Sequence, residues 1–138
     1  MTVTIFHNPA CGTSRNTLAA IRETGVEPTV VEYLKAGWTK AQLQDLLGKL
    51  DLGPRGILRV KGTPAAELGL TDPAVSDDAI LDAMVTHPIL VERPIVTSPK
   101  GAVLSRPSER VFDILDNAPA AFVKEDGERV LPGNAPDA

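Results

Sequence analysis

The sequence predicts an α/β domain whose core is a mixed sheet of about four strands, interrupted by a helical insertion. Three observations predict this class. A short apolar run, residues 3–7, is followed by a helix and then by a second β-rich run, as in a parallel βαβ unit. Residues from about 39 to 88 are predominantly helical, and a hairpin and a closing helix follow them. With 138 residues, 43% of them hydrophobic, the chain is long enough to bury one core.

The first strand, residues 3–7, ends at a loop that carries the only cysteine, Cys11. Thr13 or Ser14 can cap the helix after this loop, and Gly25 can end it. Because the strands of a βαβ unit are parallel, the cysteine loop falls at the carboxyl end of the first strand. Ligand sites of α/β sheets favour this edge.

The second strand is expected over residues 30–34 and the helical insertion over about 39–88. Within the insertion, Thr39 and Ser76 can each begin an amphipathic helix. The second of these helices should end before Pro88, since the residue that precedes a proline disfavours the helical conformation.

Residues 94–97 and 102–104 flank a turn and form the expected hairpin. Pro107 can occupy the first position of the closing helix. The order of elements is that of a thioredoxin-like domain, which we place at residues 1–116. Residues 117–138 are rich in Ala, Pro, Gly and Asp, and we expect a partly flexible C-terminal extension.

Composition excludes several classes of function. One cysteine allows no intramolecular disulfide and no cysteine cluster for a structural metal. A net charge of −4 speaks against binding to nucleic acid, which normally needs a basic face. No apolar run approaches the roughly 20 residues that cross a bilayer, so we expect no membrane association and a cytoplasmic protein.

The position of Cys11 favours chemistry over packing. A thiol at the start of a helix faces backbone N–H groups and the positive end of the helix dipole, which stabilise the thiolate. His7 could place an imidazolium or its hydrogen bond beside the sulfur, and the Ser14 hydroxyl could hydrogen-bond the thiolate. The alternatives are a buried, inert cysteine, a strand-end histidine without a role, and a serine that only caps the helix.

An oxyanion bound near this thiol needs cationic ligands from farther along the chain. A phosphatase-type loop would require arginine where Thr17 stands, and no Walker phosphate loop occurs. Arginine binds tetrahedral oxyanions with a planar pair of donors. Arg59, Arg93 and Arg106 are the candidates, and the last two bracket the hairpin and can converge at its open end.

The sequence leaves two questions open, one about these arginines and one about a proline. Each could instead be a surface residue paired with a carboxylate, for which Glu92 and Glu109 are available. The bond before Pro94 could be the cis-proline bond of a thioredoxin-like domain, although the bond before Pro88 is an equal candidate.

Several segments resemble one known family. Residues 7–18, His-Asn-Pro-Ala-Cys-Gly-Thr-Ser-Arg-Asn-Thr-Leu, are similar to the active-site signature of glutaredoxin-dependent arsenate reductases. Residues 87–90 and 92–96 resemble the second block of this family, and residues 106–109 resemble the third. Residues 122–128 are similar to a late segment. The resemblance therefore spans nearly the whole chain.

The resemblance implies that Cys11 attacks arsenate, that His7 and Ser14 help to hold its thiolate, and that three arginines bind the oxyanion: Arg59, Arg93 and Arg106. It implies reduction to arsenite for arsenic detoxification, with no bound cofactor. Glutathione would be the co-substrate, and glutaredoxin would complete the two-electron reduction. The residues agree on one point, since a chain with one cysteine needs a partner thiol.

Two other functions compete with this interpretation. Non-catalytic relatives of the same broad family include transcriptional regulators that bind RNA polymerase, so the chain could be a binding protein. The Cys-x-x-Ser pattern also permits a monothiol glutaredoxin-like reductase of mixed disulfides. We favour the arsenate reductase because neither rival needs a nucleophile together with several anion-binding arginines.

Overall fold

The computed structural model describes residues 1–132 and consists of two compact units. The first unit joins Met1–Glu32 to the described chain from Arg93 onward, and the second is Tyr33–Glu92. The expected insertion of about 39–88 lies inside the second unit. None of the helices in residues 1–132 has the length and apolar character needed to span a membrane.

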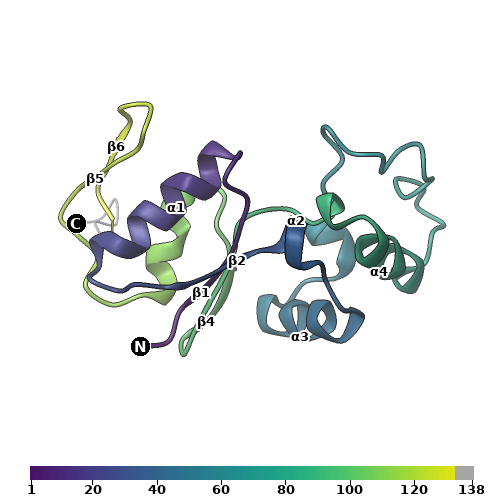
Figure 1. Ribbon diagram of the computed structural model, residues 1–138, viewed down its shortest axis with the longest axis horizontal. Coiled ribbons are helices and arrows are strands. Elements are labelled where there is room, and N and C mark those ends of the chain that lie inside the picture. Colours follow the sequence, from purple (N-terminus) through teal and green to yellow (C-terminus); the bar gives the residue numbers. More distant parts are fainter. Residues whose placement is uncertain (133–138) are drawn as a thin grey trace. The chain divides into compact units, whose positions relative to one another are not determined.

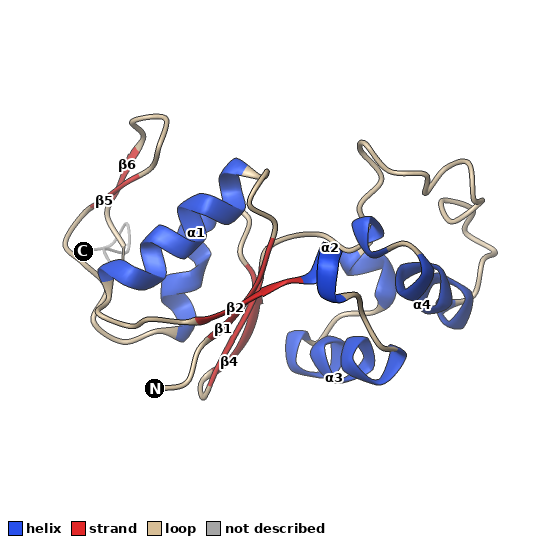
Figure 2. Cartoon of the chain, viewed as in Figure 1, coloured by secondary structure: helices blue, strands red, loops and turns tan. Residues whose placement is uncertain are grey.

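A four-stranded mixed sheet forms the centre of the first unit (Figures 1 and 2). The strand order is β2-β1-β3-β4; β1 and β2 are parallel, and the other two pairs are antiparallel. The strands are β1 (Thr4–His7), β2 (Thr29–Glu32), β3 (Ile95–Ser98) and β4 (Gly101–Leu104). The expected mixed sheet and hairpin are thus present, but β2 ends earlier than predicted, because Tyr33 begins a short helix.

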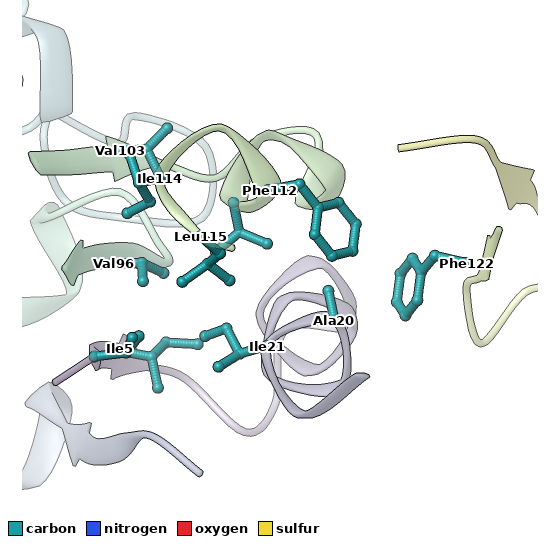
Figure 3. Close-up of a cluster of buried hydrophobic side chains, with 11 residues drawn as sticks. Ile5, Ala20, Ile21, Val96, Val103, Phe112, Ile114, Leu115 and Phe122 are labelled. Atoms are coloured by element: carbon teal, nitrogen blue, oxygen red, sulfur yellow. The ribbon is translucent and has the colours of Figure 1, made fainter. Parts of the chain in front are cut away.

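Two helical elements, α1 (Gly12–Glu23) and η3 (Ser108–Ile114), pack together and against the sheet. Figure 3 shows apolar side chains of the strands facing those of α1 and η3. Burial of such side chains stabilises the unit by roughly 1.5–3 kcal/mol each. The buried cluster comprises Val3, Ile5, Ala20, Ile21, Val96, Val103, Val111, Phe112, Ile114, Leu115 and Phe122.

Both helix starts in this unit differ from the prediction. Cys11, with φ −98° and ψ 121°, is the N-cap of α1, so neither Thr13 nor Ser14 has that role. The closing segment is a 3₁₀ helix with Pro107 as its N-cap rather than its first residue. The bonds before Pro94 and Pro107 are both cis, so the first of the two proposed cis sites is confirmed.

The described part of the C-terminal extension contains regular structure. A small hairpin, β5 (Phe122–Val123) and β6 (Arg129–Val130), follows η3. Phe122 is only 3% exposed, and its ring meets that of Phe112 edge to face at a centroid distance of 5.9 Å (Figure 3). This contact packs the hairpin on η3. The partial flexibility of the extension stays a prediction, and residues 133–138 lie outside the described residues.

The second unit is helical, as expected. Its elements are α2 (Tyr33–Ala36), α3 (Lys40–Leu50), η1 (Pro54–Ile57), α4 (Asp77–Thr86) and η2 (Pro88–Leu90). Thr39 caps α3 and forms a capping box with Gln42, while the Ser76 hydroxyl accepts a hydrogen bond from the Ala79 N–H at the start of α4. Both predicted helix starts are therefore confirmed.

Candidate active site

The loop between β1 and α1 holds Cys11 in a hydrogen-bonded turn. The Cys11 N–H donates to the Asn8 carbonyl at 3.0 Å, and the Ala10 N–H donates to Asn8 Oδ1 at 3.0 Å. The Cys11 carbonyl accepts the Arg15 N–H at 3.0 Å, the first hydrogen bond of α1. The thiol is partly exposed. The turn therefore places a reachable sulfur at the start of a helix.

The surroundings of the sulfur lower the pKa of Cys11. Burial alone would raise it, but hydrogen bonding and charge from Arg93, the backbone N–H of Ser14 and Arg106 together outweigh burial. Arg106 Nη1 lies 3.9 Å from the sulfur. Each of these groups is a donor or a cation that favours the thiolate over the thiol. The surroundings of Cys11 thus favour its thiolate form.

The sheet brings the two arginines together. Arg93 precedes β3 and Arg106 follows β4, and the pairing of Ile95 with Leu104 places these strand ends side by side. Arg106 Nη1 donates to the Arg93 carbonyl at 3.0 Å. The convergence of both arginines at the open end of the hairpin, expected from the sequence, is therefore observed.

Arg93 keeps donors free for a ligand. Its Nε and Nη1 are buried and have no hydrogen-bond partner within residues 1–132. Buried donors of a charged group carry a cost of about 1–3 kcal/mol or more when they are not satisfied. A tetrahedral oxyanion beside the sulfur would be an acceptor for donors of this guanidinium.

His7 and Ser14 contact each other beneath the loop. His7 Nδ1 and Ser14 Oγ are 2.6 Å apart, and the Asn8 N–H donates to the same oxygen at 3.0 Å. Burial lowers the pKa of His7, although Glu32 acts in the opposite direction. The lowered pKa favours the neutral imidazole, and the contribution of His7 to the thiolate stays a prediction. Ser14 acts on the thiolate through its backbone N–H.

Arg59 belongs to the second unit, where two of its three nitrogens have partners. Nη1 pairs with Glu92 Oε1 at 2.9 Å, and Nε donates to the Lys61 carbonyl at 3.1 Å. Pairing with Glu92 was the alternative that the sequence left open. The first unit thus brings together five of the six predicted site residues: Cys11, His7, Ser14, Arg93 and Arg106.

Asn8 is the residue of this site that sequence reasoning did not single out. It is 4% exposed, and its carbonyl, side-chain oxygen and N–H all take part in the turn. The signal was present, because an asparagine that precedes proline favours a turn in which its side chain accepts a backbone hydrogen bond.

A helix-capping thiol with two converging guanidinium groups on a mixed four-stranded sheet defines a thiol-dependent, anion-binding protein of the thioredoxin-like class. The comparisons with known proteins identify it further. The model of the ArsC family matches residues 6–114, and the chain belongs to this family.

The most similar relatives carry one name. A Rhizobium meliloti (strain 1021) protein named arsenate reductase is 60% identical over 132 residues, 95% of this chain and 94% of that protein. The arsenate reductase of Escherichia coli (strain K12) is 49% identical over 130 residues, 94% of this chain and 92% of that protein. The chain therefore matches these relatives over nearly their whole length.

Solved structures agree with the fold. The structure titled arsenate reductase from Vibrio cholerae has a TM-score of 0.80 and 42% identity, and the match covers 83% of this chain and 98% of that one. An ArsC family related protein from Bacteroides fragilis, with 20% identity and a TM-score of 0.69, supports the fold alone. The predicted thioredoxin-like fold is confirmed.

Proposed function

We propose that this protein reduces arsenate to arsenite for arsenic detoxification, with Cys11 as the nucleophile and Arg93 and Arg106 as oxyanion ligands. The single observation that carries the proposal is the Arg106 guanidinium 3.9 Å from a sulfur whose pKa is lowered. The names of relatives 49–60% identical to this chain supply the substrate. Arg59 is proposed as a third, auxiliary ligand.

The chemistry begins with attack on arsenic. The Cys11 thiolate forms a sulfur–arsenic bond, and one arsenate oxygen leaves as water after it gains protons. The arginines hold the remaining oxygens and stabilise their charge through the displacement. Arsenic is still As(V) in this adduct, so the step prepares the reduction but supplies no electrons.

The electrons come from thiols outside this chain, because it has one cysteine and cannot form its own disulfide. We propose glutathione as co-substrate and glutaredoxin as the reducing partner. Glutathione displaces a second oxygen as water and bonds to arsenic. A glutaredoxin thiolate then attacks the glutathione sulfur, leaves the electron pair on arsenic and forms a mixed disulfide. Hydrolysis of the As(III)–Cys11 bond releases arsenite and the free thiol.

A coupled assay tests this proposal. NADPH consumption is followed with arsenate, glutathione, glutaredoxin and glutathione reductase, for the wild type and for Cys11→Ser. We expect arsenate-dependent consumption that Cys11→Ser abolishes. Consumption with a glutathione mixed disulfide in place of arsenate and with glutaredoxin omitted, and none with arsenate in the full assay, would instead support a monothiol disulfide reductase. A folded wild type inactive on both substrates would support a binding protein.

A further inference from the structure

Two adjacent charged residues, Lys124 and Glu125, directly follow β5 in the segment that joins it to β6. Their side chains reach two different elements of the same unit. Glu125 pairs with Arg15 of α1, and Lys124 pairs with Glu109 of η3. Sequence reasoning placed this hairpin in the flexible extension and gave it no role in the site.

The Glu125 side of this arrangement reaches the segment that carries the thiol. Arg15 donates from Nε and Nη2 to the two carboxylate oxygens of Glu125, at 3.1 and 2.7 Å. Arg15 also donates from Nη1 to the Pro9 carbonyl at 2.8 Å, inside the turn that presents Cys11. One guanidinium thus joins the hairpin to the thiol loop.

Two further contacts fix Glu125 at the start of α1. Its backbone N–H donates to Asn16 Oδ1 at 2.9 Å. Its carboxylate also lies so close to Gly12 that a Cβ at that position would stand 3.2 Å from Oε1. Glu125 therefore lies against the residue that directly follows Cys11.

The Lys124 side reaches the segment that carries the anion ligand. Lys124 Nζ lies 2.8 Å from Glu109 Oε1, and Glu109 is three residues beyond Arg106. The Lys124 side chain is only 11% exposed, compared with 45% for Arg15 and 46% for Glu125. A partly buried ion pair is screened less by solvent than an exposed one. This side is the firmer of the two attachments.

We propose that Lys124 and Glu125 are positioning residues: by pairing with Glu109 and Arg15, they tie the segment after Arg106 to the segment after Cys11 and so hold Arg106 against the sulfur. The edge-to-face packing of Phe122 on Phe112 anchors the hairpin that carries both residues. The proposal rests on the proposed role of Cys11 as the nucleophile.

The double variant Lys124→Met/Glu125→Gln tests the proposal, because it removes one positive and one negative charge and leaves the net charge unchanged. Because Glu125 lies against Gly12, loss of its negative charge would by itself lower the thiol pKa, so a rise in that pKa points to altered geometry. The matched control is Arg22→Met/Glu27→Gln, which removes a bidentate ion pair, with distances of 3.0 and 3.0 Å, associated with the other end of α1.

The readout is the rate of Cys11 alkylation by iodoacetamide as a function of pH, which needs no arsenate. We expect the thiol pKa to rise in Lys124→Met/Glu125→Gln and alkylation at pH 7 to slow about threefold to tenfold. In the coupled arsenate assay, kcat/KM should fall by a similar factor. The control variant should match the wild type in both measurements.

A cycle with Arg106→Ala separates positioning from general stabilisation. If Lys124 and Glu125 act through Arg106, their substitution should have little further effect on alkylation once Arg106 is gone. Independent effects that multiply in the combined variant would overturn the proposal, as would a double variant that alkylates like the control.

Should the double variant fail to fold, Glu125→Gln alone carries the test. The Arg15–Glu125 ion pair is exposed to solvent and contributes little to stability, so this variant should fold. We expect about twofold slower alkylation at pH 7, restored in part by Glu125→Asp; alkylation equal to that of Glu27→Gln would contradict the proposal. Failure of the proposed function is a different result, namely a wild type that does not reduce arsenate.

Discussion

The guanidinium groups of Arg106 and Arg59 differ in their hydrogen-bond partners and in their neighbours. Arg106 donates to a backbone carbonyl and lies against the Cys11 sulfur, beside an Arg93 that has two buried donors without a partner in the described chain. Arg59 is paired with Glu92, and its Nε donates to a carbonyl. The proposed roles of the two arginines follow this difference: Arg106 is proposed as a direct oxyanion ligand because it lies at the sulfur, and Arg59 as an auxiliary one because Glu92 already holds it.

The largest effect is expected at the thiol itself. Cys11→Ser replaces the single thiol of the chain with a hydroxyl that is not ionised at pH 7. We expect arsenate-dependent NADPH consumption to be abolished while the circular dichroism spectrum stays that of the wild type. Turnover near the wild-type rate would contradict the assignment of the nucleophile.

Removal of either arginine at the thiol should come next. Arg93→Ala and Arg106→Ala should each lower kcat/KM about 10²-fold, because each removes a cation that stabilises oxyanion charge during attack. Each should also raise the thiol pKa, so alkylation at pH 7 should slow. Arg106→Lys is the control: it keeps the charge but loses the planar fork, and it should recover only part of the activity.

Arg59→Ala tests the comparison of Arg59 with Arg106. Arg59 already pairs with Glu92 and donates to the Lys61 carbonyl. We expect a loss of about tenfold or less in kcat/KM, smaller than for Arg93→Ala, and an unchanged alkylation profile of Cys11. Glu92→Gln, which releases the guanidinium, serves as the partner variant. A loss for Arg59→Ala as large as that for Arg106→Ala would show that this arginine binds the oxyanion directly.

The smallest effect concerns the buried imidazole beneath the loop. Because burial lowers the pKa of His7 below its usual value of about 6.5, the unfolded chain binds this proton more readily than the folded protein. Stability should therefore fall as the pH drops from about 6.5 toward the lowered pKa. In urea unfolding, the free energy of unfolding should fall less between pH 7 and pH 5 for His7→Gln than for the wild type. An equal fall in both proteins would contradict this prediction.

Local patterns in the sequence predicted the parts of the fold that local physics decides. Thr39 and Ser76 were recognised as caps because the signal lies within three residues. The start of α1 was misplaced because the Ser14 hydroxyl is used by His7 and Asn8, which precede it in the chain. The order of the extension depends on Phe122 meeting Phe112, a contact that composition does not reveal.

The candidate site divides in the same way. The pattern around Cys11 and the hairpin that brackets Arg93 and Arg106 were visible in the sequence, since a strand–loop–helix and a two-strand register fix their positions. The lowered pKa of His7 was not visible in the sequence, because it follows from burial. The ties through Lys124 and Glu125 were also missed, since Arg15 and Glu125 are 110 residues apart.

The most direct test of the central claim is the pH dependence of Cys11 alkylation in the wild type, measured with and without arsenate. The account predicts a thiol pKa below the value of about 8.5 for free cysteine and slower alkylation when arsenate is bound at Arg93 and Arg106. A pKa at or above that of free cysteine, with no protection by arsenate, would contradict it.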